Sequence, residues 1–235
     1  TMVQPRSITA VYTFDNSSQD GLVLWNKLGS QHEIEHSDVG PNGTVYGSGI
    51  SYPAGRFGNG FTSGSQTTGP DFGLWTNINQ SYDKQGTIEF WWKPDRDYDE
   101  GNSAPDETFV SGIWDSPRPW PFQLLYRWRE HNGVGGFNLN LMKQDQTGCS
   151  LRTGKVAPFN ADEWIHVAFT WNTNGLPNDP SAWYGTFIDG AYYPLTNATA
   201  PGETINHPMA VESTARFAMG YYDADSYDQC NGTLD

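Results

Sequence analysis

The sequence is poor in basic residues and has no long apolar segment. Its 235 residues include 13 Lys and Arg against 27 Asp and Glu, which gives a net charge of −14. A surface this acidic repels a phosphate backbone, so nucleic acid is a poor partner, whereas cations and neutral ligands suit it. Because no run of eighteen apolar residues occurs, we expect no membrane-spanning helix.

Cysteine is also scarce, with only Cys149 and Cys230 present. Five Asn-x-Ser/Thr triplets are acceptors for N-glycosylation in a host that glycosylates, and they begin at Asn16, Asn42, Asn79, Asn197 and Asn231. The chain is also poor in Lys and rich in Asn, Thr, Ser and Trp. This composition and the triplets together favour a secreted or cell-surface protein. In that setting we expect a Cys149–Cys230 disulfide. A bridge needs Cα atoms about 5–6 Å apart, and the sequence does not give this distance. The alternative is therefore two unrelated thiols.

Aromatic and turn-forming residues dominate what is present. The chain has 12 Phe, 12 Tyr and 10 Trp, an apolar content that a disordered chain lacks. Helical periodicity is nearly absent, and short alternating runs are separated by Gly, Pro, Asn and Asp, which predicts a β-sandwich or barrel. The clearest expected strands are residues 8–14, 86–93, 122–129, 136–143, 164–172, 184–189 and 215–221.

In four of these strands one face is apolar and the other carries polar or indole groups, because successive strand side chains point to opposite sides. Two packed sheets account for the apolar face. The polar face is either ordinary wet surface or a binding groove. An indole with hydrogen-bonding neighbours is typical of sugar sites. The predicted carbohydrate-binding residues are therefore Glu89, Trp91, Gln123, Arg127, Asn138, Asn140 and His166.

Six short segments occur in a recognisable order. They are residues 11–15 (VYTFD), 55–61 (GRFGNGF), 87–94 (TIEFWWKP), 163–168 (EWIHVA), 187–190 (FIDG) and 232–235 (GTLD). Together they resemble the opening strand and the G-K-F-G-x-A-L, F-T-I-x-x-W-V-K-P, x-W-H-H-V-A, Y-V-D-G and G-x-I-D-E-V-R-I-Y segments of the laminin-G-like, concanavalin A-like jelly-roll family. The resemblance covers nearly the whole chain. It implies one all-β domain over residues 1–235, a two-sheet antiparallel jelly-roll sandwich.

The family continues after the last of these segments into a closing strand, whereas this sequence stops at Asp235. We therefore expect the sheet edge beside residues 8–14 to lack a partner, which invites pairing with another chain. Three explanations remain open. The parent protein continues, another subunit donates the strand, or a different segment closes the sheet. We favour the first because it needs no new interaction.

The resemblance also implies a structural Ca²⁺ where the first and last strands meet. Asp15 and Asp235 stand at those two ends. Carboxylate oxygens are ligands that Ca²⁺ prefers, since it binds six to eight oxygens. We therefore expect these two residues to contribute to a calcium site.

Residues 32–36 (HEIEH) match the His-Glu-x-x-His pattern of zinc proteases. That pattern works only on a helix, where histidines four residues apart share a face. Flanking Gly, Ser and Pro leave no room for a long helix here. We interpret the match as chance.

A jelly-roll fold does not settle function, since its members include lectins, adhesion modules, glycoside hydrolases and polysaccharide lyases. Strands 122–129 and 136–143 carry no acid, whereas a glycosidase needs two carboxyl groups across the sugar. His166 with the neighbouring amides and Arg127 suits a lyase, but this strand often carries a histidine in laminin-G-like domains. We expect a non-catalytic carbohydrate-binding module. The alternatives are a structural or adhesion domain that binds protein through an open sheet edge, and a polysaccharide lyase or glycoside hydrolase.

Overall fold

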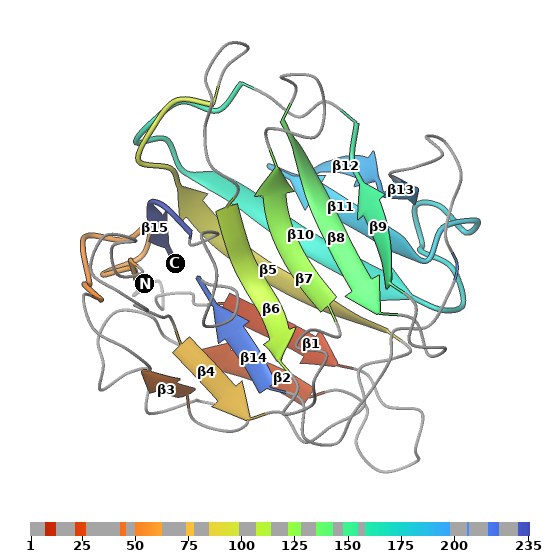
Figure 1. Ribbon diagram of the computed structural model, residues 1–235, viewed down its shortest axis with the longest axis horizontal. Coiled ribbons are helices and arrows are strands. Elements are labelled where there is room, and N and C mark those ends of the chain that lie inside the picture. Colours follow the sequence, from red (N-terminus) through yellow and green to blue (C-terminus); the bar gives the residue numbers. More distant parts are fainter. Residues whose placement is uncertain are drawn as a thin grey trace, which may run out of the picture.

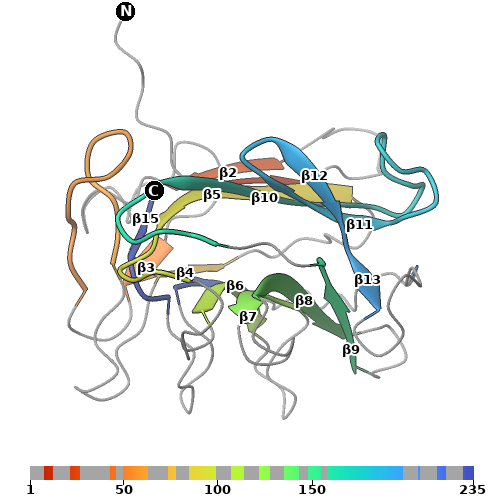
Figure 2. The same cartoon turned by 90° about the horizontal axis from the view of Figure 1, so that it is seen from above.

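Two antiparallel sheets packed face to face make up the computed structural model (Figures 1 and 2). The structure describes residues 8–12, 22–26, 43–45, 50–62, 74–77, 85–98, 107–113, 122–127, 135–142, 148–154, 158–197, 206, 216–220 and 230–235. Within these ranges every regular element is a strand, and no helix is long and apolar enough to cross a membrane. The predicted two-sheet all-β architecture is confirmed.

The first sheet has seven strands in the order β12-β11-β10-β5-β1-β2, and β15 also pairs with β5. These strands are β1 (Ile8–Tyr12), β2 (Leu22–Asn26), β5 (Gln85–Lys93), β10 (Ile165–Asn172), β11 (Tyr184–Ile188), β12 (Ala191–Pro194) and β15 (Thr233–Leu234). β1 and β15 lie end to end along the same edge of β5, because β1 pairs with its first half and β15 with its last residues.

The second sheet has eight strands in the order β13-β9-β8-β7-β6-β14-β4-β3. They are β3 (Gly43–Val45), β4 (Leu74–Asn77), β6 (Glu107–Ile113), β7 (Phe122–Arg127), β8 (Gly136–Met142), β9 (Gly148–Arg152), β13 (Thr196–Asn197) and β14 (Arg216–Met219). Figure 2 shows β6 to β9 in one layer and β5, β10 and β11 in the other. The inner faces of the two layers form the core.

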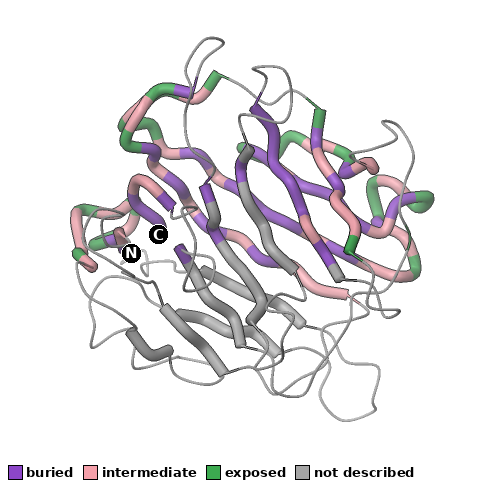
Figure 3. Tube along the Cα trace, in the orientation of Figure 1, coloured by how far each residue is buried: buried purple, intermediate pink, exposed green. Residues whose placement is uncertain are grey.

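The core is largely aromatic and follows the predicted alternation. Burial in β5 alternates from residue to residue along its second half, and Figure 3 shows buried positions along β5, β8 and β10. Trp92 is fully buried, and its ring centroid lies 4.9 Å from that of Phe109 and 5.8 Å from that of Tyr126, both from the opposite sheet. Burying such side chains stabilises the fold by roughly 1.5–3 kcal/mol each.

The edge of β1 is not open, so this prediction is wrong for the described part of the strand. All five residues of β1 pair with β2, and β1 also pairs with β5. We did not identify residues 22–26 (LVLWN) as a strand because they show no alternation of apolar and polar side chains. Among the described residues β2, from the same chain, takes the place beside β1 and is itself the edge strand. Continuation of the parent protein stays a prediction.

The C-terminal residues lie inside the sheet rather than at its edge. Thr233 pairs with Lys93 on one side of β15. On the other side, the Leu234 backbone exchanges hydrogen bonds of 2.7 and 2.8 Å with Phe61. Figure 1 shows β15 beside the end of β5. Because Thr233, Leu234 and Asp235 are all at most 6% exposed, this short segment is part of the core architecture.

The predicted Cys149–Cys230 disulfide is wrong. No disulfide joins the two cysteines, and the strand registers explain why. Cys149 pairs with Leu141 on β8. Cys230 immediately precedes Asn231, whose backbone N–H donates to Glu107, and Glu107 is level with Phe137 of β8 across β7. Four residues of β8 span about 13 Å, whereas a disulfide needs Cα atoms within about 7 Å.

Candidate functional site

The structure divides the seven predicted carbohydrate-binding residues between two sheets. Glu89 and Trp91 lie on β5 and His166 on β10, in the seven-stranded sheet. The other four, Gln123, Arg127, Asn138 and Asn140, lie on β7 and β8 of the eight-stranded sheet. The outer faces of a sandwich point in opposite directions. A shared alternation phase therefore does not place these residues in one groove, and the single-groove prediction is corrected.

The eight-stranded group offers little accessible surface among its described side chains. Asn138 is 0% exposed, and Asn140 is half-buried. By register, Asn140 is opposite Gln123 and Ser150. The side chains of Gln123 and Arg127 lie outside the described residues. Because Asn138 is buried, a ligand does not reach it without rearrangement of what covers it.

The seven-stranded group forms a compact cluster on the outer face. Trp91 and His166 are directly paired across β5 and β10, and their ring centroids are 5.0 Å apart. The Nε2 atom of His166 lies 3.7 Å from Oε2 of Glu89, with the two side chains 27% and 39% exposed. Glu89, Trp91 and His166 therefore lie together as predicted, and their role in binding stays a prediction.

Two further residues of the cluster come from a loop, where the alternation of strand side chains makes no prediction. The Arg56 guanidinium carbon lies 5.0 Å from the centroid of the Trp91 ring, and the Phe57 ring centroid lies 6.1 Å from it. Residues 55–61 were noted only as a family-like segment. Arg56, Phe57, Glu89, Trp91 and His166 are called the Trp91 cluster below.

Asp235 fixes the loop that carries Arg56 and Phe57. Its side-chain Oδ2 accepts a 2.7 Å hydrogen bond from the Phe57 backbone N–H, and the Arg56 backbone N–H also donates to this carboxyl. Its own backbone exchanges hydrogen bonds of 2.7 and 2.9 Å with Trp91. A Cβ at Gly55 would lie 2.6 Å from Oδ2, so glycine is needed for this approach.

This environment is unsuited to the predicted calcium ligand role of Asp235. Burial raises the pKa of the Asp235 carboxyl above its ordinary value, while the two backbone N–H groups act in the opposite direction. This carboxyl group is thus already engaged by N–H donors, whereas Ca²⁺ needs six to eight oxygen ligands around it. In the described part of the chain no three His, Cys, Asp or Glu residues could hold a metal ion. Asp15 lies outside the described residues, so its part in a calcium site stays a prediction.

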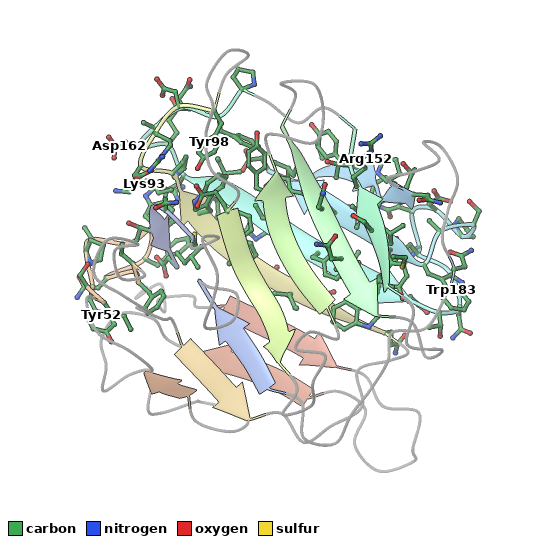
Figure 4. All side chains as sticks on the ribbon, viewed as in Figure 1. Tyr52, Lys93, Tyr98, Arg152, Asp162 and Trp183 are labelled. Atoms are coloured by element: carbon green, nitrogen blue, oxygen red, sulfur yellow. The ribbon has the colours of Figure 1, made fainter. Side chains whose placement is uncertain are left out.

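A second cation–aromatic pair lies next to the Trp91 cluster. The Lys93 Nζ atom is 5.4 Å from the centroid of the Trp164 ring. Lys93 is the next outward-facing residue after Trp91 on β5, and the register of β5 with β10 brings Trp164 level with it. Figure 4 places Lys93 at the end of β5, beside β15. The outer face therefore presents two adjacent rows across the strands, each with a cation over an indole: Arg56 over Trp91 and Lys93 over Trp164.

A different carboxyl group, Glu107, is buried at the same end of the sandwich. Its oxygens accept hydrogen bonds from the Tyr98 hydroxyl and from the Asn231 backbone N–H. The Asn231 side-chain amide donates to both oxygens at 3.0 and 3.1 Å. Burial raises the pKa of Glu107 to about 8, although these hydrogen bonds lower it. The sequence gives no signal for this group, because Glu107 is the first residue of β6 and no polar pattern surrounds it.

The predicted glycosylation sites have different outcomes. Asn16, Asn42 and Asn79 lie outside the described residues. Asn197 is half-buried in β13, opposite Leu151. The Asn231 amide nitrogen, to which a glycan would be attached, is hydrogen-bonded to the buried Glu107.

Comparison with known proteins supports the fold. No family model matches this sequence, and no curated protein matches it. Among solved structures, the chain is similar to the botulinum neurotoxin serotype G binding domain, with a TM-score of 0.51 and 9% identity over 97% of this chain and 47% of that one.

Two other similar structures are more distant by TM-score. The heptameric SAP-like pentraxin from Limulus polyphemus gives 0.48 with 13% identity, covering 79% of this chain and 72% of that one. The alginate lyase from Klebsiella pneumoniae gives 0.42 with 10% identity, covering 99% and 93%. Identities this low show the fold alone. The chain is therefore an all-β sandwich of two antiparallel sheets with the jelly-roll fold, as the sequence resemblance predicts.

Proposed function

We propose that this chain is an extracellular, non-catalytic carbohydrate-binding module and that its ligand contacts the Trp91 cluster. The observation that carries the proposal is the half-buried Trp91 indole on an outer sheet face, with a guanidinium and an imidazole each centred 5.0 Å from its ring. Aromatic rings with polar neighbours suit a ligand that has both apolar faces and hydroxyl groups, as sugars do.

The types of polar group in the cluster fit the same ligand. Glu89 offers carboxylate oxygens as acceptors, Arg56 offers only donors, and His166 offers a donor and an acceptor when neutral. Sugar hydroxyls both donate and accept hydrogen bonds. All of these side chains belong to β5, β10 or the loop fixed by Asp235. The strands and the anchored loop thus provide a preorganised surface, which reduces the entropic cost of binding.

Hydrolytic chemistry has less support at this face. Glu89 is the only carboxyl-bearing residue on β5 and β10, whereas a glycosidase uses two carboxyl groups about 5–9 Å apart. The adhesion alternative rested on an open edge beside β1, and in the described residues that edge is paired with β2. Binding without catalysis is therefore the function that the geometry favours.

The test is a glycan array followed by calorimetric titration with the best saccharide. We expect Trp91→Ala to weaken binding about tenfold or more while leaving the thermal unfolding midpoint close to that of the wild type, because stacking contacts dominate such sites. Trp183→Ala is the matched control, since Trp183 is also half-buried and lies at the opposite end of the molecule from Lys93 (Figure 4).

Two results would contradict the proposal. If Trp91→Ala binds the saccharide as tightly as the wild type, the Trp91 cluster is not the site. If incubation with polyuronates yields unsaturated products that absorb in the ultraviolet, the chain is a lyase rather than a binding module.

A further inference from the structure

Within the described ranges, two cations on the outer face of the seven-stranded sheet are not matched by carboxylates. Among the described residues, neither the Arg56 guanidinium nor the Lys93 ammonium has a carboxylate within ion-pair distance, and both lie over indole rings instead. Elsewhere in the described residues Arg96 shows the usual arrangement, with its Nε 2.8 Å from an Asp95 oxygen. In a chain with 27 acidic and 13 basic residues, two adjacent unmatched cations call for an explanation.

Glu89 and Asp235, the acidic residues described above in this region, have other partners. Glu89 lies 3.7 Å from His166. The Asp235 carboxyl is buried and accepts hydrogen bonds from the backbone of the loop that carries Arg56. The Arg56 side chain is exposed, and in the described residues its guanidinium has no hydrogen-bond acceptor. No described residue therefore occupies its five N–H donors, and a ligand can accept from them.

We infer that the Trp91 cluster selects saccharides that carry an anionic group, carboxylate or sulfate, and that Arg56 is the specificity-determining residue. The inference rests on the proposed function and adds the class of ligand. A guanidinium forms paired, charge-assisted hydrogen bonds with a carboxylate or sulfate group, and its stacking on Trp91 holds the donors in place before binding. Lys93, one row further along β5, supplies a second positive charge for the next anionic unit of a polymer.

Asp235 is a positioning residue in this arrangement. By accepting the backbone N–H groups of Arg56 and Phe57, it holds the loop against β5 without offering its negative charge to the exposed face. The acidic character of the whole chain disfavours anionic polymers at long range. Recognition therefore depends on this local pair of cations, and we expect binding to weaken as salt concentration rises.

The experiment is calorimetric titration of the chain with three oligosaccharides of equal length: one of uronate units, one bearing sulfate esters and one neutral. We expect either anionic oligosaccharide to bind about tenfold or more tightly than the neutral one. Arg56→Gln should remove this preference, because it should lower the affinity for the anionic oligosaccharides much more than the affinity for the neutral one. Arg56→Lys, which keeps the charge, should retain part of it.

Arg96→Gln is the matched control, because it makes the same change of charge at a guanidinium that is already paired with Asp95. We expect it to leave the preference unchanged. A wild-type preference for the neutral saccharide, or an equal loss for all saccharides in Arg56→Gln, overturns the inference and leaves the proposed function standing. No binding to any saccharide overturns both.

Discussion

Two buried carboxyl groups hold the C-terminal segment, and they do so differently. Glu107 lies between the sheets and is bound by the side chain and backbone of Asn231 and by the Tyr98 hydroxyl. Asp235 lies on the outer side and is bound by backbone N–H groups of the 56–57 loop. The first is fully buried at 0% exposed and the second is 3% exposed.

The difference separates stability from function. Glu107 ties residues of the last segment to β6 inside the core, so we expect its loss to affect the whole fold. Asp235 ties the loop of Arg56 and Phe57 to β5 at the rim, so we expect its loss to affect the Trp91 cluster more than the core. The predictions below test this separation.

Glu107→Ala should cause the largest loss in the free energy of unfolding. It leaves the Tyr98 hydroxyl and the Asn231 N–H groups without their acceptor and opens a cavity, which costs about 3–5 kcal/mol. Denaturant unfolding followed by tryptophan fluorescence measures the change. Glu89→Ala is the control, because this partly exposed residue should change the free energy of unfolding by about 0.5 kcal/mol or less. A loss below about 1 kcal/mol for Glu107→Ala would contradict the anchoring role.

The pH dependence of stability should show the next largest effect. The pKa of Glu107 rises from 4.5 to about 8 on folding, so between these values the folded state holds a proton that the unfolded state has released. The contribution of this group to the free energy of unfolding is complete below pH 4.5, decreases as the pH rises to about 8 and then stays constant. The total change is on the order of a few kcal/mol.

Unfolding titrations at several pH values measure this trend. Glu107→Gln should remove the part of the slope between these two pKa values, because glutamine does not titrate. An identical slope in the variant would assign the pH dependence to other groups.

Asp235→Asn should have a smaller and more local effect. The amide oxygen can accept only as a neutral group, so the loop anchor weakens by about 1–2 kcal/mol. We expect the Phe57 amide proton to exchange faster with solvent, whereas Glu107→Gln leaves its exchange unchanged. Hydrogen exchange followed by mass spectrometry of the peptide around Phe57 tests this contrast, and equal protection in Asp235→Asn would refute it.

The smallest expected effect is at the Asn231 sequon. Because the Asn231 amide nitrogen is hydrogen-bonded to Glu107, attachment of a glycan would disrupt a buried network. Expression in a glycosylating host should therefore leave Asn231 unmodified, with no mass shift on its tryptic peptide. A glycan at Asn231 in the folded protein would show that the hydrogen bonds between Asn231 and Glu107 are not maintained.

The fold was largely predictable because alternation directly reports which side of a strand is buried. Ile88, Phe90 and Trp92 are buried as predicted, while Glu89 and Trp91 face outward. Alternation does not say which sheet a strand joins. Gln123 and Asn140 share the phase of Trp91 but belong to the other sheet, so the predicted site was too large.

The parts of the site that sequence reasoning missed are made by contacts between distant segments. Asp235 and Phe57 are 178 positions apart, and Asn231 and Glu107 are 124 positions apart. No local pattern encodes such pairs, and a carboxyl group that accepts backbone N–H groups looks the same in sequence as one that binds calcium. The calcium role of Asp235 came from the family resemblance, and nothing in the sequence near Asp235 indicates the N–H donors that its carboxyl group accepts.

The place of β15 between β5 and Phe61 has a consequence for how the chain folds during synthesis. β15 is made last among these segments, yet it pairs with residues made long before it. Contacts between distant segments slow folding because the connecting chain must be ordered first. The edge of β5 that β15 covers therefore stays exposed on the ribosome until residues 230–235 emerge, and during that interval it is the place where a chaperone or a second nascent chain can pair.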